Sequence, residues 1–261
     1  MAPVRPPVPA DDDSLVAVAT ACEQTGVLSV CDARYLDHVR TSGRVLVSGD
    51  EGAVEGYAGV VDRAGTAYLT DLFVHPDARD RGHGRALLAA AWDGRGSRAT
   101  SSSQDPRALS GYARFGARPR WPLLYLRLPG GATPSAPVVV REHEQGDAGW
   151  RLGLDGLLTV AVLGGPGREA ATAVVRRDGD RYRVLRAVTP DPRGLPVLVA
   201  ELARRAGASG SVSLVVPGPH PALADVLAMG ARVEELDLWC TTPDAVDLVD
   251  PEHELPSPAL A

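Results

Sequence analysis

A short segment rich in glycine and arginine is the part of this 261-residue chain whose residue types best suit anion binding. Residues 79–84 read R-D-R-G-H-G. Gly82 and Gly84 let the backbone approach a ligand closely, because they carry no side chain. Arginine side chains neutralise phosphate and can bind it through two hydrogen bonds. The cationic residues of this segment and of the position after it are Arg79, Arg81 and Arg85.

The residues on either side of this segment predict a strand before it and a helix after it. Tyr68–Val74 is apolar, with β-branched and aromatic residues, and Pro76 ends the run. Arg85–Trp92 is rich in Ala and Leu, which favour a helix. A helix N-terminus presents free backbone N–H groups and a partial positive charge, so it binds phosphate well. The spacing is neither the dinucleotide fingerprint nor the P-loop.

The spacing R-x-x-G-x-G from Arg79 to Gly84 resembles the pyrophosphate loop of the GNAT superfamily of acyl-CoA-dependent N-acetyltransferases. The V-x-P ending at Val74–Pro76 is similar to the end of that family's fourth strand. The resemblance implies acetyl-CoA as co-substrate and no metal. It also implies a set of cofactor-binding residues, which are Leu72, Phe73, Val74, Arg79, Arg81, Gly82, His83, Gly84 and Arg85.

The same resemblance suggests catalytic residues on the central strand and on a later helix. Asp71 could act as the base or attract a cationic amine, or it could be a surface or helix-capping carboxylate. Tyr112 matches the family tyrosine that protonates the leaving thiolate, and its alternative is a packing aromatic residue. The family pattern N-x-x-A-x-x-x-Y-x-x-x-G runs here from Asp105 to Gly116. Asp105 replaces the family Asn, so its contact with the cofactor is in question.

Other polar groups are expected to play no direct part. We expect the rings of His75 and His83 to be solvated. The triplets at residues 142–144 and 252–254 read E-H-E, but they lack the H-E-x-x-H spacing of a zinc helix and lie near a linker and a tail. We therefore expect solvated charge there rather than a metal site.

The remaining pattern predicts an α/β domain of the GNAT type over Val4–Leu128. Three antiparallel strands precede the glycine loop, and a strand, a helix that begins at Asp105–Pro106 and a closing strand at Leu123–Leu128 follow the first loop helix. Two helices are expected near the N-terminus. Their ranges are Ser14 to about Gln24 and Ala33–Val39.

The second half of the chain repeats the first. With a shift of 114 residues and no gap, 16 of the 63 positions from Thr66 to Leu128 are identical, which indicates an internal duplication. The loop differs between the copies: Gly82 and Gly84 become Pro196 and Leu198. Pro196 lacks an N–H group and Leu198 blocks close approach, so the second copy should bind no acyl-CoA. The other polar positions that change are Arg81 to Leu195, Asp71 to Leu185 and Tyr112 to Val226.

These patterns predict two tandem GNAT-like domains, each a mixed, mostly antiparallel sheet flanked by helices. The predicted ranges are a catalytic domain at 1–128, a linker at 129–137, a degenerate domain at 138–248 and a flexible tail at 249–261. We expect the degenerate domain to pack on the first as an intramolecular pseudo-dimer, and a homodimer is a further option.

Composition narrows the range of partners. A net charge of −6 and a pI of about 5.5 argue against nucleic acid. No apolar run approaches a membrane span, and the acidic N-terminus is no signal peptide, so we expect a cytoplasmic protein. The three cysteines are scattered as in a reduced protein. The favoured function is acetyl transfer from acetyl-CoA to a primary amine of a small, cationic acceptor; the alternative is a non-enzymatic acyl-CoA sensor.

Overall fold

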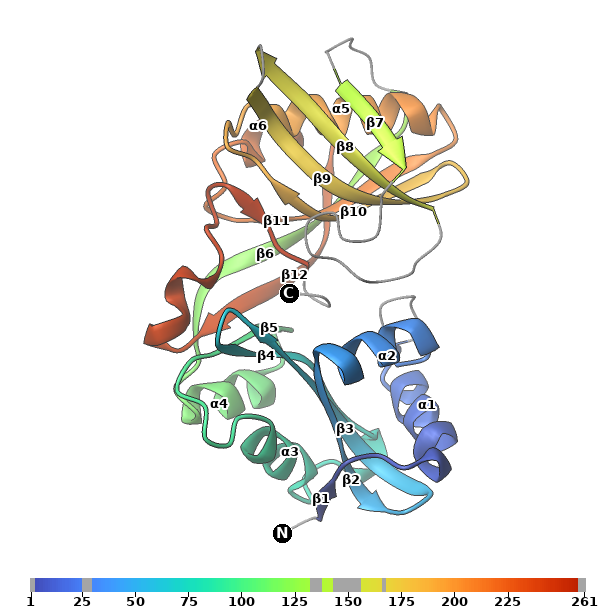
Figure 1. The fold of residues 1–261 in the computed structure, drawn as a ribbon, viewed down its shortest axis with the longest axis vertical. Coiled ribbons are helices and arrows are strands. Elements are labelled where there is room, and N and C mark those ends of the chain that lie inside the picture. The colour runs from blue at the N-terminus through green and yellow to red at the C-terminus, as the bar shows by residue number, and fades with distance from the viewer. Residues whose placement is uncertain (1–2, 25–29, 132–137, 143–155, 166–167, 258–261) are drawn as a thin grey trace. The chain divides into compact units, whose positions relative to one another are not determined.

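The computed structural model describes residues 3–24, 30–131, 138–142, 156–165 and 168–257 (Figure 1). These residues form two compact units that interleave along the chain. The first unit contains Met1–Pro119 and Cys240–Leu248, and the second contains Arg120–Trp239 and Val249–Ser257. Among the described residues, no helix is long and apolar enough to cross a membrane.

The first unit is a sheet with helices on both faces (Figure 1). Its strands lie in the order β1-β2-β3-β4-β5, and β4–β5 is the parallel pair. Gly59 of β3 faces Val39 of α2 on one side of the sheet, whereas Gly56 faces Leu87 of α3 on the other. The elements are β1 (Val4–Arg5), α1 (Asp12–Ala21), α2 (Ala33–Ser42), β2 (Gly43–Asp50), β3 (Ala53–Arg63), β4 (Thr66–Val74), α3 (His83–Ala91), β5 (Arg98–Ser102) and α4 (Pro106–Arg114).

The second unit repeats this plan in the order β12-β6-β11-β10-β9-β8-β7, and β10–β11 is its parallel pair. One face of its sheet packs on α5 and α6 around a core that includes Val175, Val184 and Leu198. The elements are β6 (Arg118–Pro129), β7 (Val138–Glu142), β8 (Leu157–Gly165), β9 (Arg168–Asp178), β10 (Arg181–Val188), α5 (Gly194–Ala206), β11 (Ser211–Pro217), α6 (Leu223–Ala228), β12 (Arg232–Thr241) and β13 (Glu254–Leu255).

The register of the central hairpin refines the duplication. The pairs nearest the turn are Arg63↔Thr66 in the first unit and Asp178↔Arg181 in the second. In each hairpin the second strand has a bulge four residues beyond its turn pair, at Thr70 and at Leu185. These strands therefore correspond with a shift of 115, and the counterpart of Asp71 is Arg186 rather than Leu185. A gapless shift of 114 is one residue short at this hairpin, although it matches the starts of β6 at Arg118 and of β12 at Arg232.

The closing strand of the first copy belongs to the second unit. β6 pairs with β11 from Leu123↔Pro217 to Pro129↔Ser211, instead of closing the sheet of the first unit. Leu126 and Leu128 are each 1% exposed in the core of the second unit, which accounts for this pairing. In the first unit, β5 is joined by the end of the second copy, where the Thr242 N–H donates to the Arg98 carbonyl.

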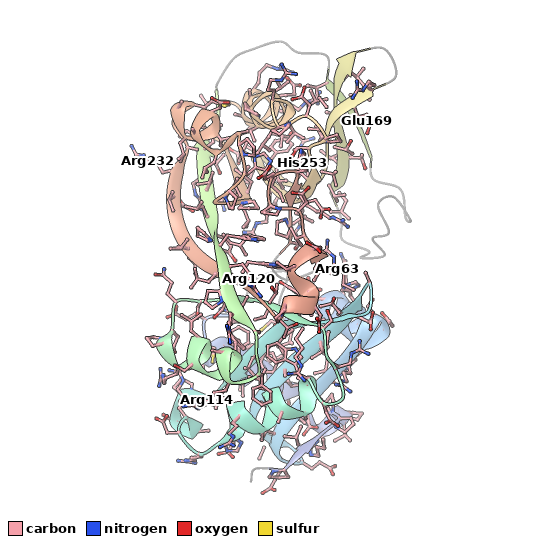
Figure 2. The ribbon with its side chains drawn as sticks, turned by 90° about the vertical axis from the view of Figure 1, so that its left-hand side faces the viewer. Arg63, Arg114, Arg120, Glu169, Arg232 and His253 are labelled. Atoms are coloured by element: carbon pink, nitrogen blue, oxygen red, sulfur yellow. The ribbon has the colours of Figure 1, made fainter. Side chains whose placement is uncertain are left out.

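The segment expected to be a flexible tail contains a short strand and buried side chains between Val249 and Ser257. β13 pairs with β10, and Val249 and Leu255 are each 1% exposed. The carbonyl of His253, a residue labelled in Figure 2, accepts from the Thr189 N–H at 2.7 Å and from the Thr189 hydroxyl at 3.0 Å. Two buried apolar side chains and a short strand pairing hold this segment. They could not be predicted from the sequence, because the composition of the segment is polar. In the predicted linker, Pro129 ends β6 and residues 132–137 lie outside the described part.

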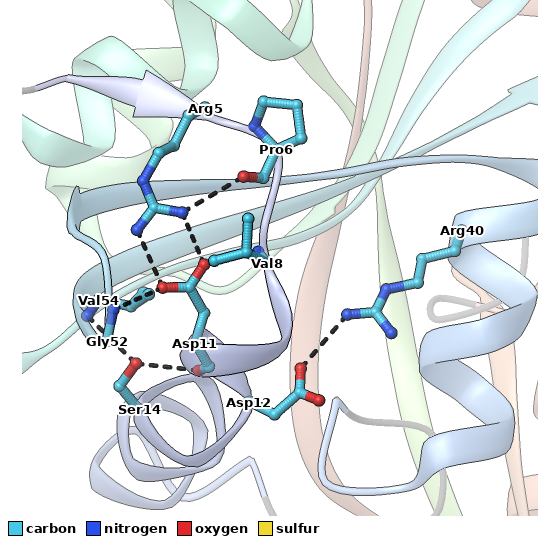
Figure 3. A network of polar contacts seen from close by, with 9 residues as sticks. All are labelled: Arg5, Pro6, Val8, Asp11, Asp12, Ser14, Arg40, Gly52 and Val54. Carbon is cyan, nitrogen blue, oxygen red and sulfur yellow. Dashed lines mark hydrogen bonds and ion pairs between the residues drawn. The ribbon is translucent and has the colours of Figure 1, made fainter.

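A buried carboxylate anchors the N-terminal segment to the β2–β3 hairpin (Figure 3). Asp11 is fully buried and accepts two hydrogen bonds from the Arg5 guanidinium, at 2.6 and 2.9 Å. It also accepts from the backbone N–H groups of Val8 at 2.8 Å and Gly52 at 3.0 Å. The hydrogen bonds from Arg5 and then from the backbone hold the pKa of Asp11 far below its usual range.

We expect Asp11→Asn to lower the free energy of unfolding at pH 7 by about 2 kcal/mol, because the charge-assisted bonds are lost. A depressed folded-state pKa stabilises the protein above the unfolded-state value of 3.8, and this stabilisation is lost as the pH falls below it. The deficit of the variant should therefore shrink below pH 4 in denaturant titrations. Asp12→Asn is the control, because Asp12 is exposed and its ion pair with Arg40, at 3.4 Å, lies at the surface. Equal effects of the two substitutions would contradict this assignment.

Candidate functional site

The glycine loop forms the turn that the sequence predicts. Gly82 has φ +90° and caps α3, a backbone conformation that favours glycine. The first helical bond that returns to the cap runs from the Ala86 N–H to the Gly82 carbonyl at 3.0 Å. The N–H groups of residues 83–85 lie before that bond, at the end of the helix where such groups have no partner within the helix. This end of α3 can therefore bind an anion.

The space above this helix end is open in the first unit. A Cβ atom built on Gly82 would meet nothing within 4 Å, and one on Gly84 would meet only Val74 Cγ2, at 3.6 Å. The fold itself thus does not require a glycine at position 84. The absence of a side chain there instead leaves room for a ligand against the backbone.

The corresponding helix start in the second unit is packed more closely. α5 begins at Gly194, where a Cβ atom would lie 2.8 Å from the Ala170 backbone. Leu195 and Leu198 are fully buried in the core of the second unit. The first turn of α5 therefore packs closely on β9, whereas a Cβ atom on Gly82 at the start of α3 would meet nothing within 4 Å.

The His83 ring is buried, in contrast to the expectation that it is solvated. It is 6% exposed, and Nδ1 lies 2.8 Å from Ser48 Oγ. Nε2 lies 3.1 Å from Glu55 Oε2, and Glu55 also contacts Arg81 at 3.4 Å. The ring turns inward because β2 and β3 supply a hydrogen-bond partner for each nitrogen, and so it fixes the loop to the sheet. The side chain of His75 is 36% exposed.

Asp105 caps α4. Its Oδ1 accepts from the Arg107 N–H at 2.8 Å, and its Oδ2 lies 3.2 Å from the Arg107 guanidinium. The hydrogen bonds from Arg107 lower the pKa of Asp105, to which the charge of Arg79 adds. Asp105 thus serves as a helix cap whose carboxylate is already paired.

β4 and β5 separate beyond their first residues. Their parallel ladder runs from Ala67↔Arg98 to Leu69↔Thr100 and then ends, although β4 continues to Val74. In the described ladders, the later part of β4 pairs only with β3, up to Gly56↔Val74. Leu72, Phe73 and Val74 are half-buried. The β5 side of this segment therefore offers backbone groups to a ligand.

Asp71 lies at the bulge of β4 as a buried carboxylate. It is 7% exposed, and its Oδ2 accepts from the Tyr35 hydroxyl at 2.6 Å and from the Thr70 hydroxyl at 2.7 Å. Burial raises the pKa of Asp71, and the two hydroxyl donors partly offset this. A Cβ atom on Gly59 would lie 2.6 Å from Asp71 Oδ2, so a glycine is needed there.

The hydroxyl of Tyr57, on the same side of the sheet as Asp71, has no hydrogen-bond partner among the described residues. Tyr57 is fully buried and its hydroxyl is unpaired in that part of the chain. Burial and then the charge of Asp71 raise the pKa of Tyr57. Its ring lies 5.5 Å from that of Phe73. An unpaired buried hydroxyl beside a carboxylate marks a place for water or a polar ligand group.

Tyr112 lies on the other side of the sheet from Asp71. It is 6% exposed on α4, and its ring centroid is 5.8 Å from that of Trp92, which follows α3. Asp71 is thus hydrogen-bonded to Tyr35 and Thr70, and Tyr112 takes no part in this group of side chains. Sequence reasoning missed Tyr35, Thr70 and Gly59, because no motif connects α2 with β4.

The described residues contain no group of three His, Cys, Asp or Glu side chains that could hold a metal ion. In the second E-H-E triplet, His253 Nδ1 lies 2.9 Å from Asp250 Oδ2. In the first triplet, His143 and Glu144 lie outside the described residues.

Residues 41–116, which include β4, the glycine loop and α3, match the family model of the acetyltransferase (GNAT) domain. The first unit carries a GNAT acetyltransferase domain. The chain is 36% identical over 120 residues to mycothiol acetyltransferase from Kineococcus radiotolerans. That match covers 42% of this chain and 40% of the relative, so the chain spans less than half of the curated relative that it matches.

Solved structures show that the GNAT-like fold extends over both units. A putative acetyltransferase from Pyrococcus horikoshii has a TM-score of 0.71 at 12% identity, over 98% of this chain and 92% of that one. A tandem GNAT protein from the clavulanic acid biosynthesis pathway has a TM-score of 0.62 at 19% identity, over 92% of this chain and 98% of that one. The chain therefore consists of two tandem GNAT-like units, each a mostly antiparallel sheet flanked by helices.

Proposed function

We propose that the first unit transfers an acetyl group from acetyl-CoA to a primary amine of a small, cationic acceptor, and that the second unit binds no acyl-CoA. The observation that carries this proposal is the difference between the two helix ends. A Cβ atom on Gly82 or Gly84 at the start of α3 has room, whereas one on Gly194 at the start of α5 would lie 2.8 Å from the Ala170 backbone, and Leu195 beside it is buried in the core. GNAT enzymes use acetyl-CoA as co-substrate, which supplies an activated thioester when bound.

The residues of the first unit can then be given roles in the reaction. The N–H groups at the start of α3 would hold the diphosphate, with Arg79, Arg81 and Arg85 nearby. The free edge of β4 over Leu72–Val74 would donate to the thioester oxygen. Asp71 would take a proton from the attacking ammonium, directly or through water. Its raised pKa brings the carboxylate closer to the pH at which a base works well.

The remaining proton goes to sulfur. Attack of the neutral amine forms the C–N bond and breaks the C–S bond, and the thiolate that leaves needs a proton. We assign this step to the Tyr112 hydroxyl on α4. The nitrogen loses two protons as the ammonium becomes an amide. Asp71 would take the first before attack, and the second, lost from nitrogen after attack, would replace the proton that Tyr112 gives to the thiolate, so that each turnover releases one proton.

An amine panel tests the proposed function. Acetyl-CoA is incubated with the full chain and with polyamines, aminoglycosides, amino acid amines or unacetylated mycothiol. Unacetylated mycothiol is included because the curated relative is named mycothiol acetyltransferase. Release of free thiol that depends on one of these amines is the expected result. Acetyl-CoA binding without turnover on any amine would favour the sensor instead.

Tyr112→Phe should lower kcat by roughly 10- to 100-fold with little change in the KM for acetyl-CoA. The variant keeps the ring that packs on Trp92 and removes only the hydroxyl. Steady-state kinetics on the best amine of the panel make the measurement. A rise in KM with unchanged kcat would instead identify Tyr112 as a binding or packing residue.

A further inference from the structure

One face of the sheet in the second unit carries a row of arginines. Arg183 of β10 lies directly opposite Arg176 of β9. On its other side Arg183 is in register with Ser213, which pairs with Arg127 of β6. Arg186 follows on the same face, opposite Val174. We call Arg127, Arg176, Arg183 and Arg186 the arginine face.

The positions in the first unit that correspond to Arg176 and Arg183 are occupied by buried hydrophobic residues. The hairpin register makes Arg176 and Arg183 the counterparts of Val61 and Tyr68, which are 4% and 0% exposed in the first unit. Arg186 replaces Asp71, so the charge at that position is reversed. The helices α1 and α2 cover this side of the sheet in the first unit, and the described part of the second unit holds no counterpart of either helix. The second copy thus lost its glycine loop and gained cations on the opposite face.

The arginine face has little compensating charge among the described residues. Glu234 of β12 contacts Arg127 at 2.5 Å, and the nearby Asp237 accepts from the Tyr125 hydroxyl at 2.7 Å. The Nε atoms of Arg176 and Arg186 are buried and have no partner within the described chain. Burial, and then the charges of Arg176 and Arg127, lower the pKa of Arg183.

Like charges directly opposite one another in a sheet destabilise it, and guanidinium groups match the oxygens of carboxylates and phosphates. We propose that the arginine face binds a small ligand that carries two or more phosphate or carboxylate groups. The ligand would accept hydrogen bonds from the forks of Arg176 and Arg183 and would relieve their mutual repulsion. This site is separate from the glycine loop and does not depend on acetyl transfer.

Calorimetric titration of the full chain with pyrophosphate and with citrate tests the proposal, with acetyl-CoA present to occupy the glycine loop. We expect binding of at least one of the two anions, and the stronger of them identifies phosphate or carboxylate as the preferred group. Arg183→Gln should weaken that binding roughly tenfold or more. Arg177→Gln is the matched control, because Arg177 points to the opposite face, over the Tyr182 ring at 5.9 Å.

The stability of Arg183→Gln supplies a second readout. If the charges of the arginine face repel one another in the absence of ligand, Arg183→Gln without ligand should melt at a higher temperature than the parent protein. Failure of both anions to bind would overturn the proposal. So would a lower melting temperature of Arg183→Gln together with unchanged anion affinity, because a structural role for the arginine would produce that combination.

Discussion

Gly84→Leu is expected to abolish acetyl-CoA binding and to leave the first unit folded. A Cβ atom at position 84 meets only Val74 Cγ2, at 3.6 Å, so the fold has room for a side chain there. A leucine would extend into the space next to the N–H groups that hold the diphosphate. We expect the Kd to rise by about 100-fold or more, which corresponds to about 2.7 kcal/mol. Isothermal calorimetry measures the affinity, and thermal unfolding checks the fold.

Gly96→Leu is the matched control for this substitution. Gly96 also lies in the first unit, and a Cβ atom there would meet only Asp244 Oδ2, at 3.9 Å. The control should keep its affinity for acetyl-CoA. Gly82 is a poorer position for the test, because its φ of +90° would strain any other residue. Unchanged affinity in Gly84→Leu would show that acetyl-CoA does not lie against this helix end.

Asp71→Asn is expected to lower kcat/KM by roughly 100- to 1000-fold, because the amide cannot accept the proton of the ammonium. The activity of the parent protein should fall at acidic pH as Asp71 becomes protonated, and the residual activity of the variant should lack this limb. Asp62→Asn is the control, because the carboxylate of Asp62 is about half exposed and pairs with Arg95. Full turnover by Asp71→Asn would make Asp71 a structural residue.

The same variant should be more stable than the parent protein at neutral pH. A carboxyl group whose folded-state pKa is raised favours folding when it is protonated, and this advantage is lost as the pH rises from 3.8 through the raised value. Asn can still accept from Tyr35 and carries no buried charge. The stability gain of the variant should therefore grow as the pH increases above 4. A gain in stability together with a loss of activity is the behaviour of a functional buried charge.

The glycine loop could be predicted from sequence because its determinants are local. Pro76 ends the strand, Gly82 permits the left-handed turn, and the Ala- and Leu-rich run that follows forms α3. The helix at Pro106 was predictable for the same reason, since Asp105 accepts from the Arg107 N–H as an N-cap does.

Contacts between distant residues could not be predicted in this way. The alternation of Leu124, Leu126 and Leu128 indicates a strand with one buried face, but it does not say which sheet the strand joins, and the structure places it beside β11. The partner of Asp71 is Tyr35, 36 residues away, and no motif connects them. The turn pairs and bulges of the two central hairpins correspond with a shift of 115, and a comparison at one fixed shift of 114 cannot follow a local change of one residue.

The stoichiometry of acetyl-CoA binding tests the central claim most directly. The claim is that the first of two GNAT-like units holds the co-substrate and that apolar side chains fill the equivalent place in the second. Calorimetric titration of the full chain should give one acetyl-CoA per chain, and titration of Gly84→Leu should give none. Two molecules per chain, or one molecule that persists in Gly84→Leu, would contradict the account.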